Sequence, residues 1–377
     1  MMTDDQELFN LLILTRLSYF HLSTIVELYR RVGSATEIMS HRAHLEELDP
    51  EISPKIVSLF DGYDSLARRA EEEMRWLSDH QVQPLALGDP DYPQLMRECS
   101  DPPLMLFYKG GVALNRPHVV AVVGTRHCTP YGQDVIRQLI GQLKALLPDT
   151  LIVSGLAYGV DVRAHREALD SGMETVGVLA HGLDTLYPAA HREVANEIAV
   201  HGGLLTEYMS GTNAGKQNFI RRNRIIAGIS HCTLLVESAS HGGGMVTASI
   251  ANSYGRDVFA VPGALGAVYS EGCNHLIRDD KARLVTTAED ILKAMGWEDD
   301  RKVRRARREG IERQLFPELS SEEKRIVGLL QKRGDLQLNL ISVQSGIPIG
   351  QATALLFQLE MKGVVRNMAG GTYHLIR

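Results

Sequence analysis

The stretch that decides the fold covers residues 119–126 and reads VVAVVGTR. Its first five residues are all apolar, as is typical of a strand buried on both faces of a parallel sheet. Gly124 then turns the chain, and Thr129 followed by Pro130 is a start signal for a helix. The residues therefore predict a buried strand, a loop and a helix, which is the repeating unit of an α/β fold.

The same alternation extends in both directions from this stretch. Apolar β-type runs occur at residues 82–87, 104–108, 119–123, 151–153, 175–179, 204–206, 233–236 and 258–261. Strands that alternate with helical patterns over about 200 residues predict a doubly wound α/β domain. We therefore predict an extended Rossmann-like domain with a mostly parallel sheet over 82–296, with 284–286 as a last edge strand.

Residues 1–80 read as all helix. Asp4 or Asp5 can cap a first helix, Ser34 with Glu37 forms a capping box, and 53–54 (Ser-Pro) starts a third helix. Short helices joined by tight turns predict a small helical domain of the helix-hairpin-helix or sterile-alpha type. Such modules bind DNA or protein, and a plain helical cap is the alternative.

The last part of the chain changes composition. Residues 297–316 form a charged linker, with RKVRRARRE at 301–309, and 317–377 read as three helices followed by a two-stranded wing. This order predicts a winged-helix domain. Its third helix carries few basic residues, so contact with protein is as compatible with it as reading of a DNA groove.

The composition limits the classes of function that the chain can have. The 377 residues carry a net charge of −6, so any nucleic-acid binding must come from a local basic patch. The four cysteines form no CxxC pair. This pattern argues against a fold held by disulfides and is typical of a protein in a reducing cytosol. No apolar run approaches ~18 residues. We expect a cytoplasmic protein without a membrane span.

Such a patch occurs at 216–228, which reads KQNFIRRNRIIAG. Cations beside an aromatic ring suit a single nucleic-acid strand, because the charges take phosphates and the ring takes a base. The alternative is a solvated basic helix end whose aromatic ring belongs to the core. The candidate DNA-binding residues here are Lys216, Phe219, Arg221, Arg222 and Arg224.

Three glycine loops follow predicted strands at the edge where a doubly wound sheet binds ligands. They place Gly124 beside Arg126, Gly155 near Gly159, and the three glycines at 242–244 before a helix. Backbone amides at a helix N-terminus favour an anion such as phosphate. We therefore add Gly124, Arg126, Gly155, Gly159, Gly242, Gly243 and Gly244 to the candidate site.

The sequence does not match most of the known motifs for catalytic and cofactor-binding sites. GTNAGK at 211–216 has the wrong spacing for a phosphate-binding P-loop, and Gln217 stands where Ser or Thr should hold magnesium. Asp161 and His165 lack a well-placed third metal ligand, so we expect structural roles, with Asp161 holding its loop. We predict no catalytic residue, metal or cofactor.

Together the motifs resemble the DprA/Smf family of DNA-processing proteins. They are DPDYP at 89–93, VVGTR at 122–126, SGLAYGVD at 154–161, GLDTLYP at 182–188, KQNFIRRNRIIAG at 216–228, HGGGMVTA at 241–248, FAVPG at 259–263 and GCNHLI at 272–277. They cover about residues 82–295 in order, and the terminal modules match larger members of the family.

The resemblance implies binding and protection of single-stranded DNA and loading of the recombinase RecA during natural transformation. It also implies a homodimer and no established catalytic activity. By motif position, the family's DNA contacts fall on Arg126, Lys216, Phe219, Arg222 and Arg224, whereas Arg221 is added here from local charge alone.

Two other functions remain open from the residues. One is a Rossmann-like nucleotide phosphoribohydrolase, with Glu207 or Glu237 at a strand end as the base. The other is an adaptor that acts through its terminal modules.

Overall fold

The computed structural model describes residues 4–298, 319–362, 364–368 and 371–375. It divides into two compact units, Met1–Gly296 and Trp297–Arg377. Most of the predicted charged linker, including 301–309, lies outside the described residues. The predicted boundaries at 80 and 316 stay predictions.

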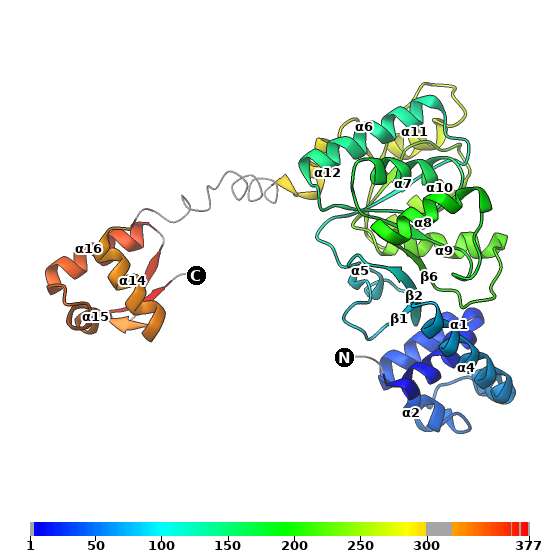
Figure 1. Ribbon diagram of the computed structural model, residues 1–377, viewed down its shortest axis with the longest axis horizontal. Helices are drawn as coiled ribbons and strands as arrows, with labels where there is room; N and C mark the ends of the chain where they lie inside the picture. The colour runs from blue at the N-terminus through cyan, green and yellow to red at the C-terminus, as the bar shows by residue number, and fades with distance from the viewer. Residues whose placement is uncertain (1–3, 299–318, 363, 369–370, 376–377) are drawn as a thin grey trace. The chain divides into compact units, whose positions relative to one another are not determined.

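The first unit is built on a nine-stranded sheet with the order β1-β2-β6-β5-β4-β3-β7-β8-β9. Figure 1 labels β1, β2 and β6, at the end of this sheet nearest the N-terminal helices. Strands β3 to β9 are mutually parallel, whereas β1 and β2 pair antiparallel at one edge. The strands are β1 Gln83–Ala86, β2 Met105–Gly110, β3 Val119–Val123, β4 Leu151–Ser154, β5 Thr175–Val178, β6 Gly202–Thr206, β7 Cys232–Leu235, β8 Asp257–Ala260 and β9 Arg283–Leu284. The predicted mostly parallel α/β sheet is confirmed.

Every residue of β3 and of β7 is buried, which explains why all of them except Thr233 are apolar. From β3 the strand order runs through β4 and β5 to β6 on one side, and from β7 to β9 on the other. The crossover connections between neighbouring parallel strands are right-handed. The helices between β3 and β6 therefore cover one face of the sheet, and the helices that follow β7 and β8 cover the other face. The boundary between β3 and β7 is therefore the topological switch point of the sheet.

The helices of this domain form two layers. On one face α7 packs against both α6 and α8, and on the other α10 packs against α9. The helices are α5 Gln94–Arg97, α6 Pro130–Leu146, α7 Val160–Asp170, α8 Arg192–His201, α9 Lys216–Gly228, α10 Gly243–Ser253, α11 Glu271–Arg278 and α12 Ala288–Met295.

The N-terminal segment is helical, as predicted. It contains α1 Asp5–Val32, α2 Ala35–Ser40, α3 Pro54–Val57 and α4 Tyr63–Asp79, with 3-10 turns at Leu45–Glu47 and Ser58–Gly62. The Ser34 hydroxyl accepts a hydrogen bond from the Glu37 amide at 3.2 Å, which fixes the start of α2. Its buried residues, including Leu11 and Ile38, join the same core cluster as Val119 of β3. These helices and the sheet therefore share one hydrophobic core.

The second unit has the winged-helix elements expected from the sequence. They are α14 Ser321–Arg333, α15 Leu338–Ser345, α16 Ile349–Met361 and a three-stranded sheet of β10 Leu336–Gln337, β11 Val365–Met368 and β12 Thr372–Leu375, in the order β10-β12-β11. Ser320 and Glu323 cap α14 reciprocally. The core includes Ile326, Ile341, Leu356 and Leu359.

Across the ranges that the structure describes, no single helix is long and apolar enough to cross a membrane. The bent pair α15 and α16, at 110°, meets the length and composition test only when the two are taken together.

Candidate functional site

A groove of about 890 Å³ opens at the carboxyl ends of β3 and β7. This is the edge at which the switch point of a doubly wound sheet is expected to hold a ligand. Its lining comes from the loops after β3, β4, β5, β6, β7 and β8, from α9, and from the first turns of α7 and α10. Among the predicted site residues, it contains Gly124, Arg126, Lys216, Phe219, Arg222, Gly242, Gly243 and Gly244.

The ring of Phe219 is the centre of the site. It is half-buried and lines the groove, so it does not belong to the closed core. The guanidinium carbon of Arg126 lies 5.2 Å from the ring centroid and that of Arg222 lies 5.8 Å away. The ring of Tyr187 meets Phe219 edge-on, at 5.6 Å between centroids and 62° between planes. An aromatic platform with cations at its border results.

Three of the predicted cations have exposed side chains: Arg126, Lys216 and Arg221. Within the described residues, none of the three makes a hydrogen bond or an ion pair. Arg126 and Lys216 line the groove, whereas Arg221 is not part of its lining. Two uncompensated positive charges therefore border the aromatic platform.

Arg222 has a different environment, because only 3% of its surface is exposed. Its Nη1 donates hydrogen bonds to the carbonyl oxygens of Gly155, at 2.6 Å, and Val178, at 2.5 Å. Burial lowers the pKa of Arg222, and the nearby carboxylate of Asp161 opposes that shift. Its guanidinium ties α9 to the ends of β4 and β5 and also lies against the ring of Phe219.

A Cβ at Gly155 would overlap the guanidinium of Arg222, which is buried and hydrogen-bonded, so glycine allows the close approach of this side chain. We expect Gly155→Ala to destabilise the fold by about 1–3 kcal/mol, since the buried guanidinium would have to leave its two carbonyl partners. Chemical denaturation of the variant measures this loss. Gly243→Ala is the matched control, because a Cβ there meets nothing within 4 Å; equal stability of the two variants would contradict the role of Arg222.

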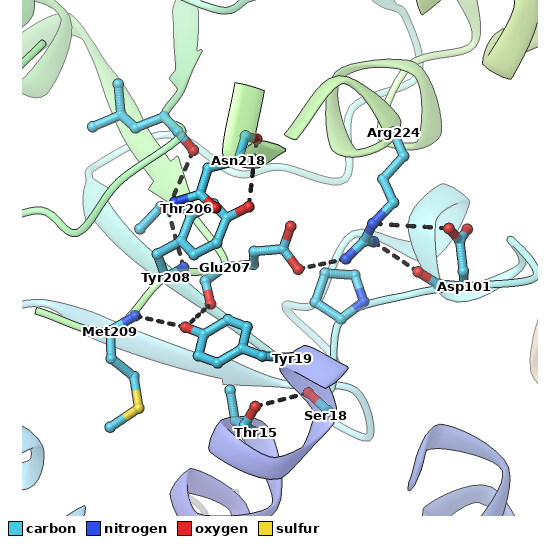
Figure 2. Close-up of polar contacts among 12 residues, drawn as sticks. Thr15, Ser18, Tyr19, Asp101, Thr206, Glu207, Tyr208, Met209, Asn218 and Arg224 are labelled. Carbon is cyan, nitrogen blue, oxygen red and sulfur yellow. Dashed lines mark hydrogen bonds and ion pairs between the residues drawn. The ribbon is translucent and has the colours of Figure 1, made fainter. Parts of the chain in front are cut away.

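Arg224 does not line the groove and is also buried, at 7% exposed. Figure 2 shows its guanidinium turned toward Glu207 and Asp101. It forms an ion pair with the buried carboxylate of Glu207, and its Nη1 donates to the carbonyl of Asp101 at 2.7 Å. Burial raises the pKa of Glu207, although Arg224 acts in the opposite direction. The structure thus separates Arg224 from the other cations of the predicted patch.

The predicted glycines also fall into two groups, those that line the groove and those that do not. Gly124 and the glycines at 242–244 line the groove, and the last of these lie in the first turn of α10. Gly155 and Gly159 are not part of the lining. Gly159 has φ +79° and lies against the backbone of Thr125 and Arg126, where a Cβ would clash. It therefore allows the loop that carries Arg126 to lie close to α7.

Two buried polar side chains at this end of the sheet, Asp161 in the groove lining and His165 outside it, have structural partners. Asp161 is hydrogen-bonded to the backbone of Ala157 and Gly155, so it holds the glycine loop as predicted. His165 is fully buried beside Thr175, with 2.7 Å between Nδ1 and Oγ1, and burial lowers its pKa to about 3. Within the ranges described, no group of three or more His, Cys, Asp or Glu side chains is placed to hold a metal ion.

Sequence reasoning missed Tyr187 as a site residue. Its side chain is 47% exposed and comes from the loop after β5, about thirty positions before Phe219. No periodicity or local charge singles it out, because only the fold brings the two rings together. Asn223, which lies inside the 216–228 motif, and Tyr269, which lies in none of the quoted motifs, also line the groove but were not predicted as site residues.

Comparison with known proteins agrees with this architecture. The family model described as DNA recombination-mediator protein A matches residues 83–296, and the DprA winged helix domain matches 312–371. Protein Smf of Escherichia coli is 31% identical over 315 residues, which cover 81% of each chain. DNA processing protein DprA of Streptococcus pneumoniae is 40% identical over 204 residues, 54% of this chain and 71% of the relative.

Two solved structures are also similar. The X-ray structure of DprA from Streptococcus pneumoniae has a TM-score of 0.57 at 32% identity and covers 72% of this chain and 97% of the other. A structure of DprA from Helicobacter pylori, described for its single-stranded DNA binding mode, has a TM-score of 0.52 at 29% identity, covering 58% and 97%. With two domain matches and relatives above 30% identity along most of its length, this chain belongs to the DprA/Smf family of DNA-processing proteins.

Proposed function

We propose that this chain binds single-stranded DNA in the groove at the ends of β3 and β7. The observation that carries the proposal is the half-buried ring of Phe219, with the exposed guanidinium of Arg126 5.2 Å from its centroid. A ring with unpaired cations at its border offers one surface to a base and another to the adjacent phosphates. The Helicobacter pylori relative, whose structure concerns single-stranded DNA, supports this interpretation.

In this proposal Phe219 stacks on an unpaired base without reading its identity. Arg126 and Lys216 neutralise the flanking phosphates, and the glycine amides at the start of α10 receive another phosphate oxygen. Duplex DNA should bind poorly, because its bases are already stacked on one another. Arg222 and Arg224, both buried, hold the groove in shape and leave the direct contacts to the exposed residues.

Arg126→Ala should weaken binding of a single-stranded oligonucleotide and reduce its dependence on salt. Each phosphate of a single strand that is no longer neutralised reduces the steepness of log K against log salt by about 0.7. Fluorescence titrations with a labelled oligonucleotide at several salt concentrations measure both quantities. The matched control is Lys293→Ala, which removes an exposed cation from α12, outside the groove. Equal slopes for Arg126→Ala and the wild type would remove Arg126 from the interface.

We further propose that the protein does not cleave or form bonds. The two glutamates suited to a phosphoribohydrolase have other partners: Glu207 pairs with Arg224, and the carboxylate of Glu237 accepts hydrogen bonds from the amide and hydroxyl of Thr129, at 2.8 and 2.6 Å. Both carboxylates thus hold the fold together, which supports a binding role. Release of free base from nucleoside monophosphates would contradict this proposal.

The larger role that we propose is protection of single-stranded DNA and loading of RecA onto it during natural transformation, by a homodimer. A groove with about two exposed cations gives modest affinity, so two grooves on one strand would gain by effective concentration. Assembly of RecA on an oligonucleotide that the protein already covers tests this step. We also propose a cytoplasmic location, which the four free cysteines support.

A further inference from the structure

The loop of residues 207–215 connects β6 to α9 and leads directly into Lys216 and Phe219. The position of the Phe219 ring therefore depends on how this loop is held. The loop contains Gly211, with φ +73°, and Gly215 just before the helix. Glycines leave a loop of this length with many accessible conformations, so contacts from outside are needed to fix it.

One such contact comes from Tyr19 on α1, nearly 190 positions earlier in the chain (Figure 2). Its hydroxyl donates to the carbonyl of Glu207 at 3.3 Å and accepts from the amide of Met209 at 3.2 Å. Its ring stacks on Tyr208, with 5.8 Å between centroids and 14° between planes. One side chain thus fixes three consecutive residues of the loop.

A second contact comes from α4. The carboxylate of Glu73 is fully buried and accepts hydrogen bonds from the amide of Ser210, at 2.9 and 3.2 Å, and from its hydroxyl. Arg69 pairs with Glu73 at 2.6 Å and donates to the carbonyl of Ser210, also at 2.6 Å. The backbone of Ser210 is therefore held through both its amide and its carbonyl.

The inner end of the loop is joined to the site. The hydroxyl of Tyr208 donates to the carbonyl of Asn218 at 3.4 Å, as Figure 2 shows, and the Asn218 amide group donates to the carbonyl of Asn213 at 3.2 Å. Phe219 follows directly, and its amide donates to Gly215 at 3.1 Å. A displacement of residues 207–210 would thus reach the first turn of α9.

We infer that the N-terminal helices position the DNA-binding groove through a bracket formed by Tyr19, Arg69 and Glu73. The bracket holds residues 207–210 and so keeps Phe219 in the orientation that receives the strand. This role rests on the proposed single-strand binding. The bracket gives α1 and α4 a role in binding as well as in the hydrophobic core. Binding residues that are already held in position lose less conformational entropy when the strand binds.

Tyr19→Phe tests the bracket, since it removes the hydroxyl and keeps the ring on Tyr208. We expect about threefold to tenfold weaker binding of a single-stranded oligonucleotide. The salt slope should not change, because every phosphate keeps its cation. The matched control is Arg30→Ala on the same helix, which removes bonds to the carbonyls of Arg97 and Cys99, away from the loop. A similar loss for both variants would indicate general docking and overturn the positioning role.

A double-mutant cycle shows whether the bracket acts through Phe219. In a Phe219→Ala background, the further effect of Tyr19→Phe should largely disappear; an undiminished effect would overturn the inference. Hydrogen exchange of the unliganded protein gives an independent readout. The amides of Met209 and Ser210 should exchange faster in Tyr19→Phe than in Arg30→Ala. If the wild type itself fails to bind the oligonucleotide, the proposed function fails; if it binds and Tyr19→Phe binds equally well, the bracket alone fails.

Discussion

Replacing Phe219 with alanine should weaken binding of a single-stranded oligonucleotide by about 1–3 kcal/mol, the usual value of one stacked base. The physical reason is that the ring is already half-buried between Arg126, Arg222 and Tyr187. Its orientation is therefore fixed before the strand arrives, so little entropy is lost when a base stacks on it. A fluorescence titration at one salt concentration measures the change in affinity.

Two substitutions at the same position separate stacking from simple apolar contact. Phe219→Tyr keeps the ring and should bind nearly as well as the wild type. Phe219→Leu keeps an apolar side chain but loses the π face, and should be nearly as weak as Phe219→Ala. The salt slope should stay unchanged in all three variants, because the phosphate contacts remain. If Phe219→Leu binds as tightly as the wild type, base stacking is not the mechanism.

The sheet could be predicted from the sequence because its signal is local. Runs such as VVAVV at 119–123 are apolar on both faces, and the glycine loops after them mark the turns. The sequence also locates the two antiparallel strands β1 and β2 but does not give their direction, since no feature of 82–87 or 104–108 reports pairing. Direction is set by partners that lie far away in the chain.

The sequence shows that the cations cluster, but it does not show which of them are exposed and which are buried. Arg221, Arg222 and Arg224 lie within four positions on one helix, and charge alone makes them equivalent. Helical geometry turns them in different directions. Arg222 then meets the carbonyls of Gly155 and Val178, while Arg224 meets Glu207. These partners come from other strands, so the burial of two arginines follows from tertiary structure.

Arg224→Met should destabilise the first unit by about 3–5 kcal/mol, the usual cost of leaving a buried charge without its partner. Glu207 is 6% exposed; its Oε2 pairs with Arg224, and its Oε1 has no hydrogen-bond partner among the described residues. Denaturant unfolding measures the loss. The matched control is Arg75→Met, which breaks an exposed pair with Glu71 and should change stability by no more than about 0.5 kcal/mol.

The dependence of this loss on pH identifies its cause. Burial raises the pKa of Glu207, and removal of Arg224 takes away the larger of the two charges that oppose the shift, the other being Arg221. The folded variant then binds a proton more tightly than the unfolded chain, whose carboxyl has a pKa of about 4.3. Stability must therefore fall as pH rises from that value through the raised folded pKa, and the deficit relative to the wild type must shrink in acid. Arg224→Met combined with Glu207→Leu removes both charges, so it should recover much of the stability and lose this pH dependence. A deficit that is the same at every pH would mean that lost packing, and not an unpaired carboxylate, destabilises the single variant.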